Sequence, residues 1–144
     1  MLNSILCGKQ VNDGFKVYLY DKGEKTEILL SSSDKSELPG ILNELFLNIN
    51  SVMRLHVDPD RAESIKKEDK AVEIIFNDEV SFKTKDRGEY KLIHLMIPLS
   101  GDLSLDQNEK RVIFLTGNPE YSGSPLVSNC DEVPLEKLLK IIDN

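Results

Sequence analysis

Residues 71–98 read AVEIIFNDEVSFKTKDRGEYKLIHLMIP, and the spacing of apolar side chains in this stretch decides the fold class. In residues 71–76, Val, Ile and Phe recur at every second position, the period-two pattern of a strand with one buried face. The polar tripeptide at 77–79 predicts a tight turn, and the alternation resumes at Val80. We therefore predict two strands here, joined by a short polar connection.

The second half of the stretch predicts a strand at the centre of the sheet. Residues 90–98 follow a polar tip at 85–88, and their middle part is apolar on both faces except at His94. Strands that are covered on both faces show such continuous apolar runs. A polar loop at 101–110 then leads into a further apolar strand at 111–116. The four strands, with their short polar connections, suggest an antiparallel meander.

A hairpin is predicted before this region. In residues 15–20, FKVYLY, Phe, Val and Leu alternate with Lys and two Tyr, which is again a strand pattern. A turn at 21–24 links this strand to a return strand at 26–30. The pattern leaves open whether residues 5–11 add another strand.

Helices are predicted on both sides of the meander in sequence. Apolar residues three and four positions apart predict a long helix over residues 38–53, with Ser36 as its N-cap and Pro39 in its first turn. Pro134 opens a shorter helix at the C-terminus. The buried stripe predicted for that helix consists of Leu135, Leu138, Leu139 and Ile142.

The stretch LHVDPDRAE, residues 55–63, allows a metal site or a helix start. On an extended chain His56, Asp58 and Asp60 would lie on one face, and a His with two carboxylates suits zinc or a similar ion. Asp58 is equally a good N-cap, and Pro59 suits the first helical position. We favour the short helix, which predicts a hydrogen bond to the Asp58 carboxylate from a backbone N–H two or three residues later.

The order of predicted elements indicates the α+β class rather than a wound parallel sheet, because the strands come in runs and the helices are segregated from them. We expect a mostly antiparallel sheet of about six strands. One long helix packs on a face of this sheet, followed in sequence by the short helix, and a further helix lies at the C-terminus. The 144 residues suit one domain, and no repeat or linker divides the chain. We therefore expect residues 1–144 to form a single domain.

Composition restricts the partners and the compartment. The formal net charge of -7 disfavours nucleic acid and suits a basic protein partner. No run approaches the length of a membrane span, and the N-terminus lacks the basic residue and long apolar run of a secretory signal. Cys7 and Cys130 are too few and too far apart for a disulfide framework. A cytoplasmic protein without membrane contact is expected.

No catalytic residue, metal ion or cofactor is predicted. The motifs GxSxG, GxGxxG, Walker A and HExxH are absent, and neither cysteine has the surroundings of an activated nucleophile. Glu73 stands in an otherwise apolar strand, where a buried carboxyl can be functional. We expect the strand to expose that face instead, and we interpret His94 as a core or half-buried residue with a hydrogen bond.

Residues 117–131, GNPEYSGSPLVSNCD, are the most unusual remaining segment. They predict an irregular loop, and long irregular loops often carry function. The alternative is a turn-rich crossover that returns the last helix to the sheet. The candidate binding residues are Tyr121, Glu120 and Asn118 of this loop, together with His94 and His56.

Three functions agree with these observations. The first is a non-enzymatic protein-binding domain, such as an inhibitor or immunity-type protein that neutralises a partner; it agrees with the acidity and the missing motifs. The second is a small-molecule-binding or enzymatic domain with a cleft near His94 and Glu73. The third is a structural subunit of a larger assembly. We favour the first, and the sequence leans against an enzyme.

Overall fold

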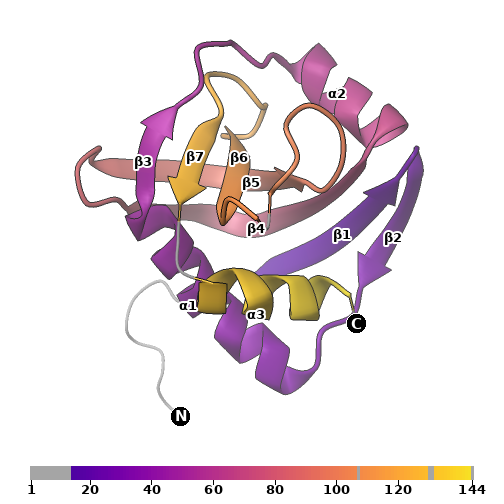
Figure 1. The fold of residues 1–144 in the computed structure, drawn as a ribbon. Helices are drawn as coiled ribbons and strands as arrows, with labels where there is room; N and C mark the ends of the chain where they lie inside the picture. Colours follow the sequence, from indigo (N-terminus) through magenta and orange to yellow (C-terminus); the bar gives the residue numbers. More distant parts are fainter. Residues whose placement is uncertain (1–13, 107, 130–131, 144) are drawn as a thin grey trace.

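The computed structural model describes residues 14–106, 108–129 and 132–143, in which seven strands form one sheet with three helices around it (Figure 1). The strand order is β2-β1-β4-β5-β6-β7-β3, and all six pairings are antiparallel. The α+β class is therefore confirmed. In chain order the elements are β1 (Phe15–Asp21), β2 (Glu24–Ile28), α1 (Ser32–Leu47), β3 (Ile49–Val52), α2 (Pro59–Glu68), β4 (Lys70–Lys83), β5 (Glu89–Pro98), β6 (Arg111–Gly117), β7 (Leu126–Asn129) and α3 (Glu132–Ile142).

The two faces of the sheet are covered by different helices. Figure 1 shows α1 and α3 together on one side of the sheet and α2 on the other. On the first side, the α1/α3 face, the ring of Phe46 stacks on Phe82 of β4 and Phe114 of β6, with centroids 4.5 and 4.8 Å apart. On the second side, the α2 face, Ala62 and Ile65 of the helix pack in a smaller apolar cluster. The main core thus lies between the sheet and the pair of helices.

Strand β4 is continuous, and the turn predicted at 77–79 is wrong. Its pairing with β5 breaks after Ile75 and resumes at Val80, so the residues between them form a local irregularity rather than a reversal. The β4 side chains that belong to the main core, Val72, Ile74 and Phe76 before the break and Phe82 after it, are all at even positions, and Val80 packs against them. Because the alternation keeps its phase, the chain continues in one direction. The polar tripeptide is exposed, which is why it resembled a turn.

The long helix begins earlier than predicted. Ser31, not Ser36, is the N-cap, and its Oγ accepts a hydrogen bond from the backbone N–H of Asp34 at 3.1 Å. Pro39 consequently lies inside the helix instead of in its first turn. The first serine of a run of three is the cap, and its hydroxyl satisfies a free backbone N–H of the first turn.

The last residues of the predicted helix form strand β3 instead. Asn48 is the C-cap of α1: its backbone N–H donates to the carbonyl of Glu44 at 3.3 Å, and its side-chain amide donates to the same carbonyl at 2.8 Å. Ile49 and Val52, predicted on the apolar stripe of the helix, pair with β7. Strand β7 occupies part of 117–131, which is therefore not irregular throughout. Ile49 is buried in β3. An apolar residue at this position also fits the spacing of the preceding helix, which is why the sequence placed it in that helix.

Helix α2 begins as predicted. The Oδ1 of Asp58 accepts a hydrogen bond from the backbone N–H of Arg61 at 2.9 Å, and Pro59 occupies the first helical position. His56 is exposed on the segment before the helix. The stretch 55–63 is thus a capped helix start.

The β1–β2 hairpin and the C-terminal helix are also confirmed, with small shifts. Lys22 and Gly23 turn the chain with positive φ angles of 51° and 95°. Helix α3 begins at Glu132, two residues before Pro134. Residues 5–11 and both cysteines lie outside the described residues.

Candidate functional site

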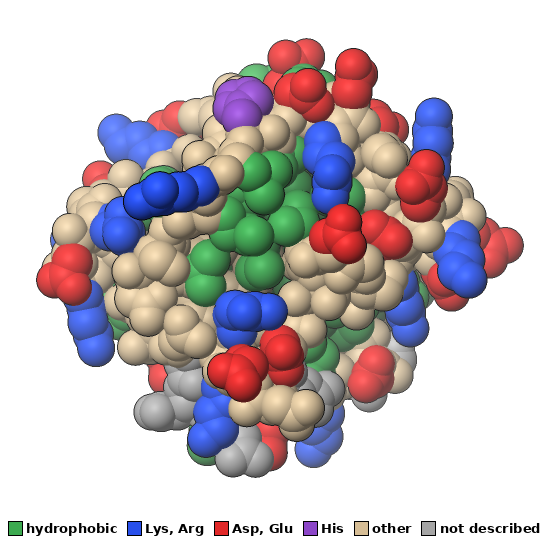
Figure 2. All heavy atoms as spheres, turned by 45° about the horizontal axis from the view of Figure 1, so that its top comes forward, with side chains coloured by type: hydrophobic (Ala, Val, Ile, Leu, Met, Phe, Trp, Pro, Cys, Tyr) green, Lys and Arg blue, Asp and Glu red, His purple; other side chains and the backbone are tan. Residues whose placement is uncertain are grey.

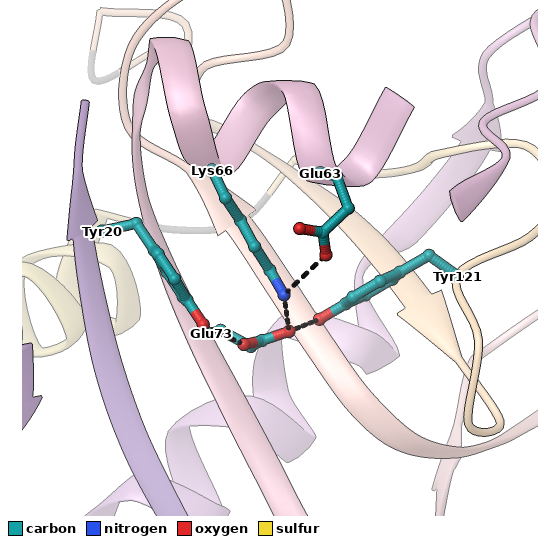
Figure 3. Close-up of polar contacts among 5 residues, drawn as sticks. All are labelled: Tyr20, Glu63, Lys66, Glu73 and Tyr121. Carbon is teal, nitrogen blue, oxygen red and sulfur yellow. Dashed lines mark hydrogen bonds and ion pairs between the residues drawn. The ribbon is translucent and has the colours of Figure 1, made fainter. Parts of the chain in front are cut away.

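A buried carboxylate lies beneath helix α2. Glu73 of β4 is 1% exposed, so the expectation that its face would be open to solvent is wrong. Its Oε1 accepts a hydrogen bond from the Tyr20 hydroxyl at 3.0 Å, and its Oε2 accepts one from the Tyr121 hydroxyl at 2.7 Å. The Nζ of Lys66 lies 3.1 Å from the same Oε2 (Figure 3). We call these four residues the Glu73 cluster.

Four separate segments bring these side chains together. Tyr20 comes from β1, Glu73 from the neighbouring strand β4, and Lys66 from the last turn of α2. Tyr121 comes from the loop after β6, which turns back so tightly that a Cβ on Gly117 would lie 2.6 Å from the carbonyl oxygen of Pro119. A bridge between Val57 and Gly123 holds this loop against the segment that leads into α2.

The electrostatics of the cluster keep both tyrosines protonated. Burial, and next the negative charge of Glu73, raise the pKa of Tyr121 well above the ordinary value of 10. The same two causes raise the pKa of Tyr20 in the same order. Lys66 also pairs with Glu63 at 3.4 Å, and its Nζ lies 5.0 Å from the centre of the Tyr20 ring. The tyrosines are therefore hydrogen-bond donors, and the lysine supplies the balancing charge.

The closed geometry of the cluster assigns it a structural role. Both oxygens of Glu73 are engaged by donors of the protein itself, and Tyr121 is only 5% exposed. A buried carboxylate is tolerated when such partners replace its water. In this arrangement the cluster connects α2 and the loop after β6 to the sheet, and it leaves no oxygen of Glu73 open to a ligand.

The sequence-predicted binding residues lie at three different places. His94 of β5 is half-buried, and its ring centroid is 5.8 Å from that of Tyr121, so the structure brings these two residues together. Asn118 and Glu120 are exposed on the outer side of the same loop and line a polar hollow of about 250 Å³. The amide of Asn118 donates to Glu79 at 2.7 Å, which ties the loop to the irregular part of β4. His56 is exposed before α2, next to the Val57–Gly123 bridge.

A groove on the α2 face was missed by sequence reasoning. Met53, Ile113 and Val127 supply its apolar floor, and its volume is about 370 Å³. Figure 2 shows hydrophobic side chains gathered in the middle of this side of the molecule, with charged side chains around them. The polar residues that line the groove are Ser51, Asp102, Glu109, Arg111 and Asn129. Because the lining comes from β3, β6, β7 and the loop 99–110, no single pattern in the sequence marks it.

Two other features bear on the kind of site present. Within residues 14–106, 108–129 and 132–143, no group of three or more His, Cys, Asp or Glu side chains could hold a metal ion. Among the same described residues, no helix has the length and apolar character to cross a membrane.

Comparison of the chain with known proteins finds no similar protein. No protein-family model matches the chain, and neither a curated protein nor a solved structure matches it significantly.

Proposed function

We propose that this chain is a non-enzymatic protein-binding domain of the inhibitor or immunity type, which neutralises a basic partner protein in the cytoplasm. One observation carries the proposal: the groove on the α2 face is lined by the partly exposed Met53 and by Ile113 and Val127, which are 3% and 8% exposed, and polar side chains make up the rest of its lining. Apolar surfaces with a polar rim are typical of protein interaction sites. The net charge of -7 favours association with a basic surface.

The Glu73 cluster supports a non-enzymatic role. A general acid or base must come within hydrogen-bond distance of the group with which it exchanges a proton. Glu73 is enclosed and accepts its contacts from Tyr20, Tyr121 and Lys66. In this position the buried carboxylate helps to hold the fold together.

Single observations also favour the two alternatives. His94 and Glu73 both contact Tyr121, which is the arrangement expected for a small-molecule or enzymatic domain with a cleft near these residues. If His94→Ala changes no measured binding or turnover, His94 has no part in such a site. Leu29 and Val133 are 82% and 57% exposed. In a structural subunit of a larger assembly, a neighbouring subunit would cover such apolar side chains. Sedimentation as a stable monomer would argue against a homo-oligomeric subunit.

The proposal is tested by affinity capture from the native organism, followed by reconstitution. The tagged chain is incubated with lysate, bound proteins are identified by mass spectrometry, and each candidate is purified and titrated against the chain by calorimetry. An unrelated acidic protein of similar size and charge is the control for adsorption. We expect one partner with a basic surface, whose activity falls when the chain is added. If no purified candidate binds the chain more tightly than it binds the control, the proposal is wrong.

A further inference from the structure

The floor of the groove on the α2 face is part of the sheet. Ile113 of β6 pairs with Val127 of β7, and Val127 pairs with Ser51 of β3, so these three residues form one row on the same face. Side chains two positions apart on a strand share a face, so Arg111 lies toward one end of the groove and Met53 toward the other. A side chain that enters the groove therefore lies across the row, above Val127.

The loop 99–110 supplies carboxylates to this groove. Asp102 and Glu109 line it from the loop, and both are exposed. Asp106 and Arg111 exchange two backbone hydrogen bonds of 2.9 and 2.8 Å. The Oδ1 of Asp106 accepts a further bond from the backbone N–H of Glu109 at 3.2 Å. These bonds hold the backbone of Glu109 beside the groove before a ligand arrives, which reduces the entropy cost of binding.

The charges around the groove favour an incoming cation. Asp102 lies 4.0 Å from Arg61, and Asp106 lies 4.0 Å from Arg111, with all four side chains more than a third exposed. Exposed ion pairs contribute little to stability, so a cation from outside can replace Arg61 at Asp102. Glu109 forms no ion pair with another of the described residues. Three carboxylates thus lie beside two arginines here.

The lining determines which kind of side chain can fill the groove. Met53 is partly exposed and Val127 is 8% exposed, while the carboxylates of Asp102 and Glu109 lie beside them. A fully apolar side chain would displace water from the carboxylates without replacing its hydrogen bonds. Arginine combines an apolar stem, which packs on apolar surface, with a guanidinium that donates parallel hydrogen bonds to carboxylates.

We propose that the groove binds one arginine side chain of the partner protein. The stem of the arginine packs on Met53 and Val127, and its guanidinium pairs with Asp102 and Glu109, where it replaces Arg61 at Asp102. Arginines buried at the centre of an interface are among the residues that contribute most to binding. This inference rests on the proposed protein-binding function, and it names the side chain that the basic partner inserts.

The test is a titration of the folded, isotope-labelled full-length chain with N-acetyl-arginine methylamide, followed by amide chemical shifts. We expect a Kd in the millimolar range, with shifts in β3, β7 and the loop 99–110. N-acetyl-citrulline methylamide has nearly the same shape without the charge and is the ligand control. Because its neutral head cannot form charge-assisted bonds to the carboxylates, its Kd should be at least about tenfold higher.

Two variants of the chain remove the carboxylates one at a time. Asp102→Asn and Glu109→Gln keep the size of each side chain and lose its charge, and each should raise the Kd of the arginine derivative about threefold to tenfold. Both residues are exposed, so the variants should fold, which circular dichroism checks. Glu24→Gln makes the same change in charge on β2, at the opposite end of the sheet, and should leave the Kd unchanged.

The outcomes separate this surface from the protein-binding function itself. Equal Kd values for the arginine and citrulline derivatives, shifts confined to other parts of the chain, or equal effects of Glu109→Gln and Glu24→Gln would overturn the assignment. A purified partner that binds the double variant Asp102→Asn, Glu109→Gln as tightly as the unchanged chain refutes this surface and leaves the protein-binding function in place. Binding of the arginine derivative in the groove, without any partner in the capture experiment, supports the arginine site and refutes the function.

Discussion

On the α1/α3 face of the sheet, the contacts that hold the helices are between apolar side chains, whereas the α2 face combines a smaller apolar cluster with a buried ion pair. The ring of Phe46, for example, stacks on those of Phe82 and Phe114. α2 buries Ala62 and Ile65, and its attachment is completed by the contact between Lys66 and Glu73. Apolar contacts are numerous and have little directionality. A buried ion pair depends on both partners, so the loss of one leaves the other uncompensated.

The difference has a consequence for how each face responds to mutation. On the α1/α3 face the cost of a substitution should follow the volume that is removed. On the α2 face it should follow the number of hydrogen bonds and charges that lose a partner. The groove belongs to the α2 face, so the surface proposed for binding lies beside the part of the fold that is held by specific polar contacts.

The largest effect is expected for Phe46→Ala on the α1/α3 face. The variant would leave a cavity between Phe82 and Phe114, and we expect the free energy of unfolding to fall by about 3–5 kcal/mol. Denaturation with urea measures the change. Leu47→Ala, at the next residue but with 40% of Leu47 exposed, is the matched control and should cost less than about 1 kcal/mol. Similar losses for the two variants would contradict a core centred on Phe46.

Glu73→Ala should have the next largest effect, on the α2 face. It removes the acceptor of two tyrosine hydroxyls and one partner of Lys66, and we expect a loss of about 2–3 kcal/mol. Urea denaturation again gives the magnitude, and hydrogen exchange shows whether α2 loses protection first. Glu63→Ala removes the exposed partner of Lys66 and should cost less than about 0.5 kcal/mol. If both variants lower the free energy of unfolding by the same amount, the burial of Glu73 does not make its carboxylate more important for stability than that of Glu63.

Tyr121→Phe should cost about 1 kcal/mol, because it removes a single hydrogen bond and keeps the ring. The loss should appear in the midpoint of urea unfolding without a change in slope. Tyr18→Phe is the control: Tyr18 is a half-buried tyrosine of β1, and removal of its hydroxyl should change stability little. A neutral Tyr121→Phe would mean that the Glu73 cluster does not stabilise the fold through this hydroxyl.

The same tyrosines predict a dependence of stability on alkaline pH. Burial and the Glu73 charge raise the pKa of Tyr121 and of Tyr20 above 10 in the folded protein, so the folded state holds these protons more tightly than the unfolded state does. The resulting stabilisation is present below pH 10 and is lost as the pH rises from there toward the folded-state pKa. We expect the free energy of unfolding to decrease above pH 10, and to decrease less in Tyr121→Phe. Equal slopes for the two proteins would remove Tyr121 from this explanation.

The smallest effect is expected for Asp58→Ala at the start of α2. It removes the hydrogen bond to the backbone N–H of Arg61, which is typically worth about 0.5–1 kcal/mol at an exposed N-cap. Asp60→Ala, two residues further on, keeps that bond and is the control. Thermal unfolding followed by circular dichroism is sensitive enough to compare them. A larger loss for Asp60→Ala would show that charge, rather than capping, stabilises this end of the helix.

Several elements could be predicted because their signals are local. The N-cap at Asp58 depends on residues within one helical turn, the alternation in β1 depends on neighbours two positions apart, and the strand at β5 follows from a run of consecutive apolar residues. The uninterrupted β4 could also have been recognised, since the even-numbered apolar positions keep their phase on both sides of the polar tripeptide at 77–79. A change of direction there was not required by the pattern.

Other features depend on contacts between distant residues. Ile49 is buried in β3 because β7, nearly eighty residues later, pairs with it. In the sequence Ile49 continues the apolar spacing of the preceding helix. The residues adjacent to it in the chain do not indicate that a strand begins here. Of the candidate site residues, His94 and Tyr121 could be named from the sequence, but their contact could not. The groove was not predicted at all, because Met53, Ile113 and Val127 are apolar residues of ordinary strands or their ends.

The sequence by itself determined the α+β class, the mostly antiparallel character of the sheet and the capped start of α2, because each of these follows from the spacing of residues near one another in the chain. The tertiary structure decided whether the carboxylate of Glu73 is buried or exposed. In the sequence it is a carboxylate in an apolar strand, and solvent would be the simplest partner for its charge. Tyr20, Lys66 and Tyr121, from three other segments, replace that solvent, and only the folded chain brings them within hydrogen-bond distance of the carboxylate.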